Sequence, residues 1–232
     1  MNSKASPRGT LDRDLRIVQE DLMRLGGMLD QAIERAMQAL IERDVNLAHR
    51  VVEDDAAIND LRFRIEEFCL ATIATQQPTA GDLRAIVAGM NIVVDLERMA
   101  DHAAGIATTV IRMGDDPPVK ELIDLPRMAE QCREMTRKAL RAYLAADVEL
   151  ARQVAAQDDA IDGLYTQIFR ELLTFMIEDP RTTTRALYLL FAGHNLERIG
   201  DRATNIAERV VFMASGQMRE LNPEPFDTTD IE

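Results

Sequence analysis

Two helical segments of the chain carry an acidic pair with the same spacing. Glu97 precedes Asp101 by four positions, Glu197 precedes Asp201 by four, and both pairs lie in the pattern Glu-Arg-x-x-Asp. Residues four apart lie one turn above each other on the same helix face. Two carboxylates held this close repel each other, and the repulsion grows when they are buried. Each pair therefore needs a cation nearby, which a metal ion or an arginine can supply.

A second set of polar residues has the same spacing earlier in each half of the chain. Asp55 is followed four residues later by Asn59, and Asp158 by Asp162. Both aspartates continue apolar stripes, so we expect them to point inward or into a groove. If the helices are neighbours, four carboxylates meet in the second half, and three carboxylates and an amide meet in the first. The expected metal ligands are Asp55, Asn59, Glu97, Asp101, Asp158, Asp162, Glu197 and Asp201.

The chemistry of this ligand set is that of oxygen donors alone. Oxygen ligands favour hard or borderline metal ions, and bridging carboxylates favour sites that hold more than one ion. We expect divalent or trivalent ions in a multinuclear arrangement, with Fe, Zn, Mg, Mn and Ni all open. His194 lies three residues before Glu197, and it is either a further ligand or a hydrogen-bonding histidine at the edge of the core.

Two other interpretations use the same acids. Arg98 and Arg198 can neutralise them as structural ion pairs, which would make the protein a metal-free helical adaptor. Alternatively, the acids form a carboxylate-bridged multimetal hydrolase or oxidase, although no Glu has a His three residues later and no Walker-type glycine loop is present. The arginine-rich stretches 62–64 and 133–141 are interleaved with acids and indicate ordinary helix surface.

The elements that must position these residues are long helices. Apolar residues recur every three or four positions over residues 11–43, which is typical of an amphipathic helix. Asp44 is expected to cap a second helix, and Pro78, Pro180 and the 114–118 segment with its paired prolines interrupt the helical pattern. The expected helices cover residues 11–43, 45–76, from 79–82 to 113, 126–146, 148–178 and 183–215.

The chain contains an internal repeat of about 100 residues. Residues 44–51 match 147–154 at an offset of 103, and residues 96–107 match 196–207 at an offset of 100 with seven identities in twelve. Long helices with short connections pack as antiparallel bundles. The sequence therefore predicts an all-α fold, a tandem duplication of a three-helix antiparallel bundle with six helices. We expect a flexible N-terminus at 1–10, repeats at 11–113 and 119–215, a linker at 114–118 and a disordered tail at 216–232.

Composition excludes several classes of protein. The 232 residues carry a formal net charge of −13, which argues against nucleic-acid binding because phosphate contacts need a basic surface. The longest apolar run, residues 85–94, is far shorter than a membrane span, and no signal-peptide pattern is present, so we expect a cytoplasmic protein without membrane insertion. Cys69 and Cys132 form no metal-binding pattern and are expected in the core.

Residues 196–208, with the pattern Glu-Arg-x-Gly-Asp-x-x-x-Asn-Ile, resemble the signature of the PhoU family, regulators of phosphate uptake. Residues 25–28 (Leu-Gly-Gly-Met) and 77–84 resemble the family as well. The resemblance covers about residues 10–215. It implies two three-helix bundles in an elongated flat molecule, metal clusters held by Glu/Asp-x-x-x-Asp pairs on the bundle surface, and a homodimer. Asn59, Met99, Ala100 and Gly105 depart from the family pattern, so the first site is expected to be weaker or to hold fewer ions.

The resemblance also implies a role. Family members are non-enzymatic negative regulators that link the phosphate ABC transporter, through its ATPase subunit, to a phosphate-sensing histidine kinase. On this interpretation the protein holds the kinase in its phosphatase-favouring state when phosphate is ample and restrains phosphate uptake.

Overall fold

The computed structural model describes residues 7–114 and 116–222, and all regular structure within them is helical. The helices are α1 (Pro7–Glu42), α2 (Val45–Gln76), α3 (Ala80–Met113), α4 (Asp124–Ala145), α5 (Val148–Ala155), α6 (Asp158–Glu178) and α7 (Thr183–Ser215), with a short 3₁₀ helix η1 (Pro180–Thr182) between α6 and α7. The expected boundaries are met within two residues for most of these helices.

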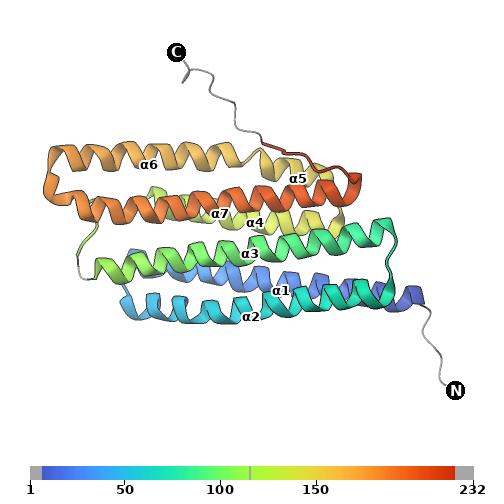
Figure 1. The fold of residues 1–232 in the computed structure, drawn as a ribbon. Coiled ribbons are helices and arrows are strands. Elements are labelled where there is room, and N and C mark those ends of the chain that lie inside the picture. The colour runs from blue at the N-terminus through green and yellow to red at the C-terminus, as the bar shows by residue number, and fades with distance from the viewer. Residues whose placement is uncertain (1–6, 115, 223–232) are drawn as a thin grey trace, which may run out of the picture.

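The helices form two three-helix units that pack against each other. Helices α1, α2 and α3 pack together, and so do α4, α7 and the pair α5–α6. Helix α3 packs along α7, and α1 contacts α4, so the four helices α6, α7, α3 and α2 lie side by side with α4 and α1 behind them (Figure 1). The buried apolar residues form one continuous core, which includes both free cysteines. The predicted all-α, duplicated three-helix fold is confirmed.

Local sequence signals set the ends of several helices. The carboxylate of Asp44 accepts the backbone N–H of Leu47 at 2.8 Å, and Asp147 in the second repeat accepts the N–H groups of Glu149 and Leu150 at 3.0 Å. These hydrogen bonds satisfy donors that the first turn of a helix leaves unpaired. Asp44 is therefore an N-cap, as the sequence predicted.

One expected helix is interrupted. Residues 148–178 were predicted as a single helix, but the chain turns at Ala156 and Gln157, where the N–H of Gln157 donates to the carbonyl of Val154 at 3.0 Å. This tighter bond of the 3₁₀ type ends α5, and α6 begins at Asp158 with two acids in its first turn. The positive end of a helix dipole favours carboxylates there. No Gly or Pro marks the break, and α2 is continuous at the corresponding place.

The described residues include structure beyond the predicted helices on both sides. Helix α1 begins at Pro7, a favourable first helical residue, and not at residue 11. Residues 216–222 were expected to be disordered, yet the N–H of Leu221 donates to Glu208 at 3.0 Å and the Asn222 amide donates to Asp159 at 3.2 Å. The first part of the tail therefore packs on the second repeat. The rest of the predicted tail, residue 115 of the linker and residues 1–6 lie outside the described residues.

Helices α3 and α7 meet through two contacts that the repeat makes equivalent. Arg202 donates to Asp95 at 3.4 Å, and the counterparts of these residues at an offset of 100, His102 and Asn195, lie 3.0 Å apart. A Cβ atom on Gly105 would lie 2.8 Å from Oδ1 of Asn195. The departure from the family pattern at Gly105 therefore lets Asn195 pack at the interface between the two repeats.

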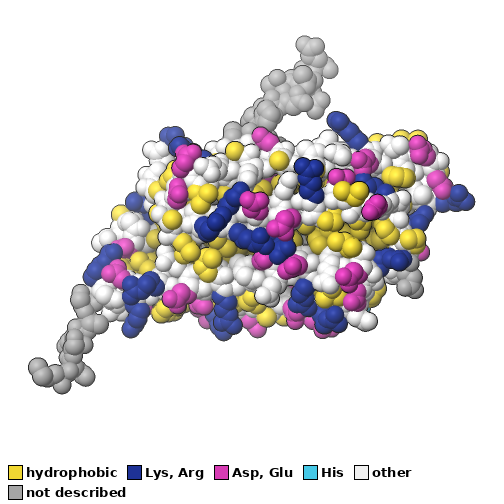
Figure 2. Space-filling model, turned by 180° about the vertical axis from the view of Figure 1, so that it is seen from behind, with side chains coloured by type: hydrophobic (Ala, Val, Ile, Leu, Met, Phe, Trp, Pro, Cys, Tyr) yellow, Lys and Arg dark blue, Asp and Glu magenta, His cyan; other side chains and the backbone are white. Residues whose placement is uncertain are grey.

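Helices α1 and α4 join the repeats on the opposite side. Burial alone would raise the pKa of Asp30, but hydrogen bonds from Arg133 and Arg137 lower it. A groove of about 490 Å³ lies beside this cluster. The 133–141 stretch was predicted to be ordinary helix surface, and two of its arginines also form an ion-pair cluster between the repeats. On this face, charged side chains of both signs are interspersed with apolar ones (Figure 2).

Candidate metal centre

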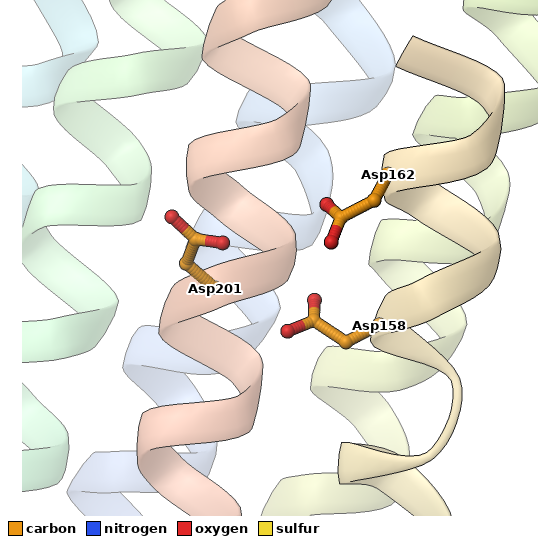
Figure 3. Close-up of side chains that lie close together, drawn as sticks. All are labelled: Asp158, Asp162 and Asp201. Atoms are coloured by element: carbon orange, nitrogen blue, oxygen red, sulfur yellow. The ribbon is translucent and has the colours of Figure 1, made fainter. Parts of the chain in front are cut away.

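Three carboxylates meet between α6 and α7. Asp158 and Asp162 on α6 face α7, where Asp201 lies (Figure 3). Each offers one oxygen atom, and these three atoms all lie within 4.8 Å of one another. Asp158 is buried, Asp201 is half-buried and Asp162 is exposed, so the group extends from the core to the surface. We call Asp158, Asp162, Asp201 and the neighbouring Glu197 the acidic cluster.

The electrostatics of the acidic cluster are those of crowded anions. Burial first, then Asp162 and Asp201, raise the pKa of Asp158 to about 6. Burial and Asp201 raise the pKa of Glu197 to about 7, although Arg198 opposes the shift. Among the described residues, Oδ1 of Asp158 and Oε2 of Glu197 are buried without a hydrogen-bond partner. Buried polar atoms are nearly always paired, so these two oxygens are available to a proton or to a cation.

Cationic side chains compensate only part of the negative charge of the acidic cluster. Nη1 of Arg198 donates to Oδ2 of Asp201 at 2.9 Å, as the ion-pair interpretation expected. Nδ1 of His194 lies 3.5 Å from Oε2 of Glu197, and its ring lies 6.1 Å from that of Tyr165. His194 is thus placed beside the acidic cluster, where Arg198 pairs with Asp201.

Glycine at position 200 allows α6 to approach α7 at the acidic cluster. A Cβ atom there would lie 3.3 Å from Oδ1 of Asp158 and 3.2 Å from Cγ2 of Ile161. Contacts this short force a neighbour to shift. The first repeat has Ala100 at this place, which is the departure that the sequence showed.

The corresponding place in the first repeat is partly neutralised. The Asn59 amide donates to Oδ2 of Asp55 at 2.9 Å, and Nη1 of Arg62 donates to Oε1 of Glu97 at 2.9 Å. Burial, then Asp101 and Glu97, raise the pKa of Asp55. Asp101 is exposed, and within residues 7–114 no three acids come as close together as in the second repeat. The four expected residues of the first repeat therefore lie close together, and Arg62 adds a cation to them.

Arg62 belongs to the candidate site, and the sequence interpretation missed it. It was assigned to ordinary helix surface, yet it forms the ion pair with Glu97. At the offset of 103 its counterpart in the second repeat is Tyr165, which carries no charge. Aligning the two repeats at this position would have revealed the difference, because Arg62 lies three residues after Asn59 on the same side of α2.

The residues of the second repeat fit a metal ion well. Its four carboxylates are hard oxygen donors on two adjacent helices, and Oδ1 of Asp158 is buried without a hydrogen-bond partner among the described residues. The first repeat fits a metal ion less well, because Arg62 already pairs with Glu97 and Asn59 stands where the second repeat has an acid. Bound there, a metal ion would compensate the carboxylates and join α6 to α7.

Comparison with known proteins agrees with the geometry. A family model described as the PhoU domain matches residues 22–110 and again 125–210. The phosphate-specific transport system accessory protein PhoU homolog of Rhizobium meliloti is 38% identical over 215 residues, 92% of this chain and 91% of the relative.

Two solved structures share the fold. The crystal structure of PhoU from Pseudomonas aeruginosa has a TM-score of 0.84 and 36% identity, covering 89% of this chain and 99% of that one. The phosphate transport system regulatory protein PhoU from Streptococcus pneumoniae has a TM-score of 0.84 and 28% identity, covering 90% and 99%. No helix among the described residues is both long and apolar enough to cross a bilayer. With two domain matches that cover most of its length and a relative of this identity, the chain belongs to the PhoU family.

Proposed function

We propose that this protein is a metal-binding, non-enzymatic negative regulator of phosphate uptake. Relatives and structural neighbours are named as an accessory protein and as a regulatory protein of phosphate transport systems, which supports the role. The observation that carries the metal-binding part is the buried, unpaired Oδ1 of Asp158 among three further carboxylates.

The acidic cluster is the main site in this proposal. Asp158, Asp162, Glu197 and Asp201 hold one or more ions of Mg, Mn, Fe, Ni or Zn. Asp55, Asn59, Glu97 and Asp101 form a second, weaker site, because Arg62 already compensates Glu97. Binding of an ion requires ionised carboxylates, so it would displace the protons that the raised pKa values of Asp158 and Glu197 retain.

The partners in this proposal are the ATPase subunit of the phosphate ABC transporter and a phosphate-sensing histidine kinase. The protein acts in the cytoplasm, as a homodimer, and restrains uptake when phosphate is ample. The metal ion would hold α6 against α7 and so keep the shape of the surface that these helices present.

The test uses purified full-length protein and its purified partners. Elemental analysis is expected to find metal in the wild type and a large loss in Asp158→Asn/Asp201→Asn, with anomalous scattering at the α6–α7 groove. Binding to the ATPase subunit or the kinase is then measured with and without phosphate and metal. Absence of binding to either partner under every condition would overturn the regulatory role.

One observation favours a metal-free adaptor as the second candidate. Arg198 pairs with Asp201, and Arg62 pairs with Glu97, so each site contains an internal cation. A metal-free preparation in which Glu197→Gln and Asp201→Asn leave stability unchanged would support this alternative. Phosphoester hydrolysis or oxygen consumption by the metal-loaded protein would instead reveal the multimetal hydrolase or oxidase.

A further inference from the structure

We infer that α6 and α7 form a docking surface for one amphipathic helix of a partner protein, with a basic polar face. The surface consists of four exposed apolar side chains, which we call the apolar strip: Phe169, Leu173, Leu187 and Phe191. They are 44%, 43%, 37% and 52% exposed, respectively.

The apolar strip is continuous across two helices. Tyr165 on α6 lies beside His194 on α7, with ring centroids 6.1 Å apart. Because the two helices pack antiparallel (Figure 1), each turn forward along α6 lies beside one turn back along α7. Phe169 is therefore level with Phe191, and Leu173 is level with Leu187. The strip begins one turn beyond Tyr165, next to the acidic cluster.

The first repeat shows that the fold does not need the two exposed aromatic residues of the strip. At the same offsets, Phe169 corresponds to Glu66 and Phe191 corresponds to Asn91. Glu66 lies 3.4 Å from Arg62 in an ion pair, and the Asn91 amide donates to the carbonyl of Val87. At these two places the first repeat has polar residues where the second has exposed aromatic ones, whereas Leu70 and Val87 keep the other two places apolar. Exposed aromatic side chains next to each other mark interaction sites.

The size of the apolar strip fits one helix. Its side chains expose on the order of 300 Å² of apolar surface, since a whole aromatic side chain covers about 150–250 Å². A stable pair of proteins buries roughly 800 Å² on each partner. The strip alone is too small to hold a second copy of this chain, but apolar residues spaced one turn apart match the spacing on the apolar face of one amphipathic helix.

The negative charge of the acidic cluster favours a partner helix with basic residues. The acidic cluster lies at one end of the strip. Arg198 and a single divalent ion would together cancel three of its four carboxylate charges and leave a net negative charge. A second copy brings another formal charge of −13, and residues 223–232 of this chain contain four acids and no basic residue. Both are repelled by the acidic cluster, whereas lysine or arginine residues on the polar face of a partner helix are attracted.

A designed peptide provides the probe. It is a 16-residue helical peptide with leucines on one face and lysines on the other, and its matched control has glutamates in place of the lysines. Fluorescence anisotropy measures peptide binding to the wild-type protein and to the double variant Phe169→Glu/Phe191→Asn. This variant has, at both positions, the residue that the first repeat has at the corresponding position. Leu70→Ser removes an exposed leucine at the place in the first repeat that corresponds to Leu173, and serves as the control variant.

The double variant is expected to bind the lysine peptide at least tenfold more weakly than the wild type, and Leu70→Ser to bind it as the wild type does. The glutamate peptide is expected to bind the wild type at least tenfold more weakly than the lysine peptide. Equal binding by the double variant and the wild type, or of the two peptides to the wild type, overturns the inference.

Two further measurements identify a different occupant. A wild-type dimer that becomes a monomer in the double variant, in light scattering after gel filtration, would assign the strip to a second copy. A tenfold gain in peptide affinity on removal of residues 223–232 would assign it to the chain's own tail. Either result overturns the inference. The double variant is expected to keep the metal content of the wild type, so loss of peptide binding is distinguishable from loss of the proposed metal site.

Discussion

Arg62 and Tyr165 occupy equivalent places in the two repeats, and they make the two acidic sites electrostatically different. Arg62 donates to Glu97 at 2.9 Å, whereas Tyr165 leaves Glu197, the counterpart of Glu97, without a cation from α6. Burial raises the pKa of Tyr165, and Glu197 adds to the shift. The duplication thus produced one site in which α2 supplies a cation to the glutamate and one in which α6 supplies none.

Exchanging these two residues should exchange the properties of the sites. Tyr165→Arg places a guanidinium group beside Glu197, so metal affinity at the second repeat should fall at least tenfold, because the metal then competes with a fixed cation. Arg62→Tyr with Asn59→Asp should create a stronger site in the first repeat. Isothermal titration calorimetry with Mn²⁺ measures both, and unchanged affinity in Tyr165→Arg would contradict the electrostatic assignment.

The metal-free protein should become less stable as pH rises from 5 to 7.5. The pKa of Asp158 is raised to about 6 and that of Glu197 to about 7 in the folded protein. At a pH between the ordinary pKa of each group and its raised value, the folded state therefore holds more protons than the unfolded state. Stability is then lost as pH rises through that window. Thermal unfolding in the presence of a chelator checks this.

The same experiment with Glu197→Gln provides the control, because a neutral amide has no proton to lose. Its melting temperature at pH 7.5 should exceed that of the metal-free wild type, and its decrease between pH 5 and 7.5 should be smaller. An identical pH profile for the two proteins would show that Glu197 does not titrate in this range.

Gly200→Ala should weaken metal binding more than it weakens the fold. The added Cβ atom would lie 3.3 Å from Oδ1 of Asp158 and displace this carboxylate, for a stability cost of about 1 kcal/mol. Gly163→Ala is the matched control, because no atom lies within 4 Å of its added Cβ. That exposed helix substitution should stabilise the protein by about 0.5–1 kcal/mol. Metal titration and chemical denaturation of both variants separate the two effects.

Gly26 and Gly27 should respond oppositely to alanine. A Cβ atom on Gly26 would collide with Cδ1 of Leu140 on α4, whereas a Cβ atom on Gly27 meets nothing within 4 Å. Gly26→Ala should therefore destabilise the protein by about 1–3 kcal/mol through overpacking. Gly27→Ala should stabilise it by up to about 1 kcal/mol through helix propensity. Urea unfolding measures the two variants, and equal effects would show that α1 and α4 can separate without cost.

Short-range patterns were sufficient to predict most of the architecture. Apolar residues at intervals of three and four predicted the helices, Asp44 predicted an N-cap, and the repeat predicted two equivalent units. These features depend on neighbours within a few positions along the chain, which is why they can be read without a structure. The spacing of Glu197 and Asp201 likewise placed them on one helix face.

The break at Gln157, the docking of Leu221 and the ion pair of Arg62 were not predictable in the same way. The break lies in a stretch without Gly or Pro, and the docking of Leu221 depends on Glu208 on a different element.

The sequence by itself determined that each repeat would carry acids one turn apart on its helices. Only the tertiary structure decided which acids are paired with an arginine. Whether Arg62 points to solvent or to Glu97 depends on the approach of α2 to α3, and whether Asp158 meets Asp201 depends on the gap that Gly200 opens between α6 and α7. Charge compensation falls off steeply with distance in a partly buried site, so the spatial arrangement of the helices, and not the residue types alone, sets the chemistry of each site.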